Sequence, residues 1–167
     1  MANDKKQETK AEFTESMPSN PITIKAQYTK DLSFENPNIL KLLSEPAAQS
    51  PDISVNVHVE AKPLENNDFE VTLNIQAKAS LEKAEVFIAE LAYAGVFGIA
   101  EEIPEESLKP LVLIECPRLL FPFARNIIAE ITRDGGVPPL MLNPVDFVEM
   151  YRQQANQGNQ TAKTKKN

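Results

Sequence analysis

The sequence predicts an α+β fold in which a four-stranded antiparallel sheet is followed by two helices. Two observations support this prediction. Polar and apolar residues alternate with the period of a β-strand in three segments before residue 80, whereas helical spacing of apolar residues begins only after residue 104. Because the strands precede the helices instead of alternating with them, we expect an antiparallel sheet with one face exposed to water.

Composition predicts a single domain of modest size. The 167 residues are 42% apolar and 25% charged, as in ordinary globular proteins. Residues 1–20 and 153–167 are polar without apolar periodicity, so we expect flexible tails around a domain at residues 21–152. The sequence has no secretory signal, no apolar run long enough to cross a membrane, and one cysteine, which together favour a cytoplasmic location.

Strict alternation predicts the first three strands. They cover Ile22–Tyr28, Ile53–Ala61 and Phe69–Ala79, and each places its apolar residues on one face. The polar cluster Glu65–Asp68 predicts the turn between the second and third strands. The segment Asn36–Pro51 predicts a long loop that crosses the sheet edge, as a Greek-key connection does.

The fourth strand, predicted over Glu82–Tyr93, is apolar on both faces. One face has an ordinary core composition: Phe87, Ala89, Leu91 and Tyr93. The other face should be wet, yet it carries a single carboxylate among apolar residues: Val86, Ile88, Glu90 and Ala92. Such a patch indicates either a contact surface or burial beneath a loop or tail, and alternation does not decide between them.

Two helices are predicted after residue 104. Prolines at positions 110, 117 and 122 are expected to interrupt the first, which leaves a regular helix over Pro122–Asp134. Gly135 and Gly136 then end it. Asn143 and Pro144 predict the start of the last helix, whose apolar residues are Val145, Phe147, Val148 and Tyr151.

No group of residues in the sequence predicts catalysis. His58 is the only histidine and lies on the polar side of a strand, so it cannot form a metal site alone. Cys116 precedes a proline in an apolar segment, which favours a buried thiol over an activated nucleophile. With only five glycines, no phosphate-binding loop is present. We therefore predict a non-enzyme without cofactor or metal.

Charge restricts the partners that this domain can bind. Residues 21–151 carry a net charge of −10, whereas residues 1–20 carry −1 and residues 152–167 carry +4. An acidic domain repels nucleic-acid phosphates and anionic lipids, so we expect no nucleic acid partner and no direct membrane insertion. A basic protein surface is the complementary partner, although acidity also serves solubility alone.

Three motifs resemble those of the SecB family of protein-export chaperones. The longest is CPRLLFPFARNIIAEITRDGGVPPLMLNPVDF at residues 116–147, where the family pattern reads roughly CPxxLFPYARxxIxxxxxxGxFPxLxLxPVxF. The others are YTKDLSFENPN at residues 28–38 and FIAELAYAGVFGI at residues 87–99. Their order and spacing are those of the family, and the resemblance covers about residues 20–152.

The resemblance implies an ATP-independent holdase that binds unfolded preproteins, keeps them competent for translocation and delivers them to the SecA motor. It also implies a homotetramer, built as a dimer of dimers, with helices between the sheets. The family's motor-contact positions fall on Asp31, Glu35, Ile88 and Glu90. Residues that the resemblance implies for tetramer assembly are Ala89, Leu91 and Tyr93, and the apolar side of the first helix adds Phe123 and Ile127.

A holdase binds many sequences through apolar surface, because burial is not directional. The segments 36–50 and Val137–Leu142 are apolar although loops are expected to be polar, so we place the client groove between them. The residues that we expect to line this groove are Phe34, Leu40, Leu42, Leu140, Leu142, Phe147 and Tyr151. For each of them taken alone, packing in the core explains its apolar character at least as well. Two other functions fit the sequence: a SecB-like module dedicated to one client, as in a toxin–antitoxin system, and a small-molecule carrier or enzyme.

Overall fold

The computed structural model describes residues 20–44, 50–82 and 84–164, with side chains up to residue 156. Four strands, β1 (Ile22–Glu35), β2 (Asp52–Pro63), β3 (Asp68–Leu81) and β4 (Ala84–Ile99), form one antiparallel sheet in the order β1-β4-β3-β2. Because β2, β3 and β4 follow one another while β1 lies beside β4, the predicted Greek-key connection and α+β class are confirmed.

All four strands are longer than predicted, and β4 shows why. It continues past Tyr93 to Ile99 through a segment, AGVFGI, in which polar and apolar residues do not alternate. A Cβ on Gly95 would lie 2.9 Å from the side chain of Leu120, so this glycine allows the helix to approach the sheet closely. The turn between β2 and β3 is confirmed, with Asn66 and Asn67 at φ 57° and 59°.

Strand β1 changes faces twice. Ile22 pairs with the buried Ile99 on the helix side, as predicted. A register shift before Ala26 then turns Ala26 and Tyr28 to the opposite face, so the prediction that they share the face of Ile22 was wrong. Each such bulge adds one residue and reverses the alternation, and the second directs Asp31 outward.

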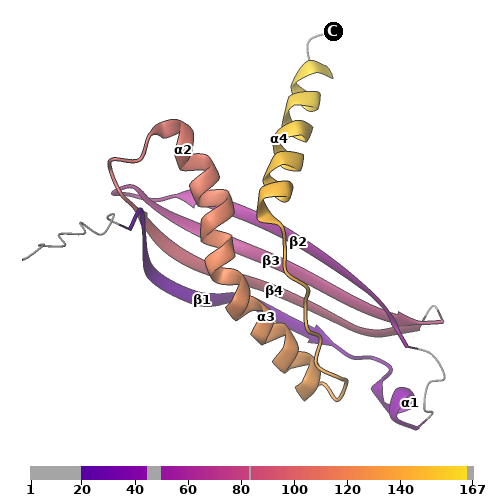
Figure 1. The fold of residues 1–167 in the computed structure, drawn as a ribbon. Coiled ribbons are helices and arrows are strands. Elements are labelled where there is room, and N and C mark those ends of the chain that lie inside the picture. Colours follow the sequence, from indigo (N-terminus) through magenta and orange to yellow (C-terminus); the bar gives the residue numbers. More distant parts are fainter. Residues whose placement is uncertain (1–19, 45–49, 83, 165–167) are drawn as a thin grey trace, which may run out of the picture.

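The helical half lies across one face of the sheet (Figure 1). It runs without a break through α2 (Glu105–Pro110), a π-helical segment η1 (Leu111–Glu115) and α3 (Cys116–Asp134). The prediction that prolines interrupt this helix was therefore wrong. Proline 110 cannot donate a backbone hydrogen bond, and the helix widens directly after it instead of ending.

Two further helices differ from the prediction. The short α1 (Ile39–Ser44) lies inside the segment that was expected to be a loop. Helix α4 (Phe147–Thr164) begins after Asp146, whose Oδ1 accepts the N–H of Glu149 at 2.9 Å, and not at Asn143. It projects from the sheet (Figure 1) and continues to Thr164, so most of the tail predicted at 153–167 is helical. The predicted N-terminal tail lies outside the described residues, apart from Asn20.

The core lies between the sheet and α3. Its most deeply buried large apolar side chains are Phe97, Leu73, Ile75, Leu120 and Ile128, all less than 2% exposed except Ile75 at 2%. Burying each of them contributes about 1.5–3 kcal/mol. Among the residues that the structure describes, the helices cover one face of the sheet only, and the face turned away from them is here called the outer face. No helix among the described residues is long and apolar enough to span a membrane.

Candidate functional site

An apolar pocket of about 410 Å³ lies where α1 and the start of β2 meet the segment between α3 and α4. Leu42 and Leu140, which the sequence analysis placed in the client groove, both line this pocket. The lining also includes residues that the sequence did not single out: Ser50, Pro51, Ile53, Val86, Phe87, Val137, Pro138 and Pro139. Exposed apolar surface continues from Ile53 to Val55 on the same face of β2.

The other residues predicted for the groove lie elsewhere. Leu142 and Phe147 are buried in the core, and neither is among the residues that line the pocket. Phe34 stacks on Phe87, with ring centroids 5.8 Å apart, behind the pocket wall. Leu40 is 80% exposed on α1 and Tyr151 is half-buried on α4, both outside the lining.

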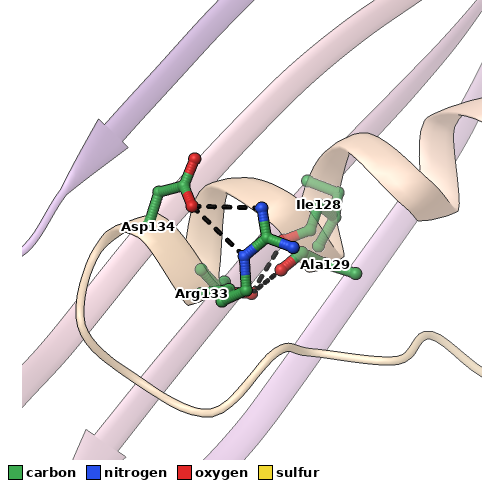
Figure 2. Close-up of polar contacts among 5 residues, drawn as sticks. Ile128, Ala129, Arg133 and Asp134 are labelled. Carbon is green, nitrogen blue, oxygen red and sulfur yellow. Dashed lines mark hydrogen bonds and ion pairs between the residues drawn. The ribbon is translucent and has the colours of Figure 1, made fainter.

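Thr132 fixes the connector that forms one wall of the pocket. Its buried hydroxyl lies 2.8 Å and 3.0 Å from the carbonyl oxygens of Ile128 and Ala129, and it accepts the N–H of Leu140 at 2.9 Å. Figure 2 shows these two carbonyl groups beside the Arg133–Asp134 pair at the end of α3. Since a buried N–H without a partner is costly, the Thr132 hydroxyl holds Leu140 in place.

Gly135 joins this connector to β1. A Cβ at this position would lie 2.3 Å from the ring of Phe34, so only glycine permits the observed contact. The side chain of Asn36 donates to the carbonyl oxygen of Gly135 at 2.6 Å. The end of β1 and the end of α3 are thereby fixed next to each other, beside the pocket.

One end of the outer face is neutralised by ion pairs that cross β4. Lys25 Nζ lies 2.7 Å from Asp68 Oδ2, and Lys30 Nζ lies 3.0 Å from Glu70 Oε2. Tyr28 also donates to Glu70, which raises the pKa of the Tyr28 phenol and, together with Lys30, lowers the pKa of the Glu70 carboxyl. Lys25 crosses β4 at Gly98, which has no side chain: a Cβ at this position would lie 3.0 Å from Lys25 Cε.

The other end of the outer face carries the predicted motor-contact residues together. In the register of β1 and β4, Glu35 pairs with Ile88, Ser33 with Glu90, and Asp31 with Ala92. Ile88 is half-buried, and the three acids are exposed. Among the residues that the structure describes, no ion pair forms at these acids, and Glu90 accepts a hydrogen bond from Gln76. Val86, predicted on the same face, is instead buried and lines the apolar pocket.

The residues assigned to tetramer assembly fall into two groups. Ala89 and Leu91 are 0% and 2% exposed in the core against the sheet. They cannot contact a second copy of the chain directly, so any effect on assembly would come from the residues that pack on them. Phe123 is 50% exposed and stacks on Tyr93 with ring centroids 6.3 Å apart. Ile127 lies one turn further along α3 and is half-buried.

The groups considered for chemistry are not brought together. His58 is exposed on the outer face, and Cys116 is completely buried. Burial raises the pKa of the Cys116 thiol to about 12, which keeps it protonated and unreactive. Within the described part of the chain, no three acidic, histidine or cysteine side chains are grouped as a metal site requires.

Known proteins of similar sequence belong to one family. The family model for SecB, described as preprotein translocase subunit SecB, matches residues 15–158. Protein-export protein SecB of Rhodopseudomonas palustris is 57% identical over 139 residues, 83% of this chain and 85% of that protein. Its counterpart in Afipia carboxidovorans is 53% identical over 161 residues, 96% and 99% of the two chains.

The fold is also similar to that of a solved structure. A SecB-like chaperone of Mycobacterium tuberculosis, solved in complex with a peptide from the HigA1 antitoxin, matches with a TM-score of 0.56 and 18% identity. The match covers 75% of this chain and 91% of the mycobacterial one.

Proposed function

Because this chain belongs to the SecB family of protein-export chaperones, we propose that it is an ATP-independent holdase that binds unfolded preproteins and delivers them to the SecA motor. The family resemblance carried by the three sequence motifs is confirmed by the comparisons. The observation that carries the holdase proposal is the apolar pocket where α1, β2 and the connector meet. Its lining is almost entirely apolar, which suits many client sequences better than one small polar substrate.

The position of the pocket supports a binding mode for extended chains. Strand β2 is at the edge of the sheet, and Ile53 near its start lines the pocket. An extended client can pair its backbone with this edge, which adds affinity without sequence preference, while an apolar side chain enters the pocket. Each 100 Å² of apolar client surface buried there contributes about 2.5 kcal/mol.

Serine substitutions in the pocket test this proposal. We expect Leu42→Ser combined with Leu140→Ser to weaken the binding of an unfolded preprotein about tenfold or more and to reduce suppression of its aggregation. Leu64→Ser is the matched control, because Leu64 is also exposed but lies in the β2–β3 turn away from the pocket. Unchanged client affinity in the double variant would place the groove elsewhere. Binding of one client and of no unrelated unfolded protein would favour the dedicated module instead.

We assign motor docking to the outer sheet face. The exposed acids Asp31, Glu35 and Glu90 lie around Ile88 at the end of the face that ion pairs do not neutralise, which suits a basic partner segment such as the family's SecA tail. Asp31→Ala or Glu90→Ala should lower motor affinity several-fold without altering client binding, and the effect should shrink as salt is added. Glu102→Ala removes an exposed charge outside the strands and serves as control. If Asp31→Ala and Glu90→Ala bind the motor as tightly as wild type and Glu102→Ala do, this assignment is contradicted.

The homotetramer is likewise a proposal, supported by exposed apolar residues beside the edge strand β1. Ile24 and Leu119 are 46% and 41% exposed and border a hollow of about 560 Å³ between β1 and the helices. Phe123 lies one helical turn beyond Leu119. A second copy of the chain that covers this apolar surface would remove it from water.

A further inference from the structure

One wall of the apolar pocket is a short loop whose two ends are bound to the same residue of α3. The backbone N–H of Val137 donates to the carbonyl oxygen of Thr132 at 3.3 Å, and the N–H of Leu140 donates to the Thr132 hydroxyl at 2.9 Å. Pro138 and Pro139, which lie between these two bonds, have no N–H. This loop, from Val137 to Leu140, lines the pocket along its whole length and is here called the proline wall.

Thr132 decides where the proline wall lies, because little else holds this part of the chain. Among the described residues, the backbone of residues 138–144 takes part in only one other hydrogen bond, from Arg125 Nε to the carbonyl oxygen of Leu142 at 2.7 Å. Helix α3 has ended before it, and none of the described strands pairs with it. The width of the pocket between the wall and the facing residues of α1 and β2 therefore depends on the Thr132 hydroxyl.

The Thr132 side chain is placed to act as both donor and acceptor. It is fully buried, and its oxygen lies 2.8 Å and 3.0 Å from the carbonyl oxygens of Ile128 and Ala129, either of which can accept its single proton. Its lone pairs then accept the N–H of Leu140. Valine has nearly the same shape but no acceptor. At this position it would leave that N–H without a partner unless Leu140 moved toward water and away from the pocket.

We propose that Thr132 is a positioning residue for client binding: its hydroxyl holds the proline wall at the distance from α1 and β2 that an apolar client side chain requires. The inference rests on the proposed client pocket and assigns to Thr132 no contact with the client itself. A wall that is already held in place does not have to be ordered when the client binds. A wall that is often displaced lowers the apparent affinity, because only molecules with the wall in place are competent to bind.

The test is titration of the full-length chain with reduced, carboxamidomethylated lactalbumin, an unfolded protein that cannot refold because its thiols are blocked. Thr132→Val should bind this probe about fivefold or more weakly, since an unmet buried N–H disfavours the held wall by at least that factor. Thr132→Ser keeps the hydroxyl and should bind close to wild type. Thr72→Val is the matched control and should also bind like wild type, because Thr72 is the other buried threonine among the described residues and does not line the pocket.

Two further measurements separate positioning from a general loss of stability. If Thr132 acts through Leu140, Thr132→Val should weaken binding much less in a chain that already carries Leu140→Ser, whereas the effects of unrelated sites add. In wild type, the Leu140 amide should exchange its hydrogen slowly. Thr132→Val should accelerate this exchange while circular dichroism shows an intact fold.

A folded Thr132→Val variant that binds the probe as tightly as Thr72→Val overturns the inference. An equal loss of affinity in Thr132→Ser, or additive effects of Thr132→Val and Leu140→Ser, also overturns it. If Thr132→Val does not fold, fast exchange of the Leu140 amide in wild type overturns it without that variant.

The proposed function survives each of these results as long as wild type binds the probe and Leu140→Ser weakens that binding. If wild type does not bind the probe, or if Leu42→Ser combined with Leu140→Ser leaves its affinity unchanged, the proposed client pocket itself is contradicted.

Discussion

Phe123 allows the proposed assembly to be tested quantitatively. Its ring is 50% exposed, which for a phenylalanine leaves about 100 Å² of apolar surface in water. Substitution by alanine removes most of this area, about 2 kcal/mol of association free energy per copy if a second chain covers it. A two-fold symmetric interface contains the residue twice. Phe123→Ala should therefore raise the dissociation constant about a thousandfold.

Sedimentation equilibrium over a range of concentrations measures this change. Leu64→Ala is the matched control, because Leu64 is 42% exposed but lies in the β2–β3 turn. Loss of the stacking on Tyr93 should itself cost only about 0.5–1.5 kcal/mol of folding stability, so Phe123→Ala should remain folded by circular dichroism. A folded Phe123→Ala variant that assembles as tightly as Leu64→Ala would refute the proposal that this surface is covered.

Two further predictions concern stability. The pKa of the Cys116 thiol is raised from 9.0 to about 12 in the folded chain. The contribution of the protonated thiol to the free energy of unfolding is therefore complete below about pH 9 and decreases as the pH rises toward 12. We expect a loss of about 1.4 kcal/mol by about pH 10 in urea unfolding, absent in Cys116→Ala; an equal alkaline loss in that variant would contradict it. Gly135→Ala should cost about 1–3 kcal/mol because its Cβ overlaps the Phe34 ring. Phe34→Leu should recover part of this cost, and additive effects of the two changes would argue against a direct contact.

The sequence predicts the strands well where polar and apolar residues alternate without a break, as in β2 and β3. It fails where local rules compete with packing. The bulges of β1 reverse the alternation, and their positions depend on pairing with β4, which is distant in sequence. The prolines of the helical half are poor helix formers, yet the helix continues through them because α3 packs on the sheet.

The candidate site is predictable only in part. The sequence singles out Leu42 and Leu140 because they are apolar residues in segments that were expected to be loops, and both line the pocket. Phe147 is also apolar but is buried. Whether an apolar residue lies in the core or lines the pocket depends on which surfaces the helices cover, and the sequence does not show this. Ile53 reads as an ordinary inward strand residue, and it is exposed only because the helices do not extend over the start of β2.

Phe87 and Ile88 test whether the two surfaces act independently. Successive strand residues face opposite sides, so Phe87 lines the apolar pocket while Ile88 lies on the outer face opposite Glu35. Ile88→Ala should weaken motor binding up to about tenfold and leave client affinity unchanged. Phe87→Leu should weaken client binding instead, with a folding cost of about 1–3 kcal/mol because it also removes the stacking on Phe34. If either substitution lowers both affinities by the same factor, the two surfaces are coupled, and neither can be assigned to one partner alone.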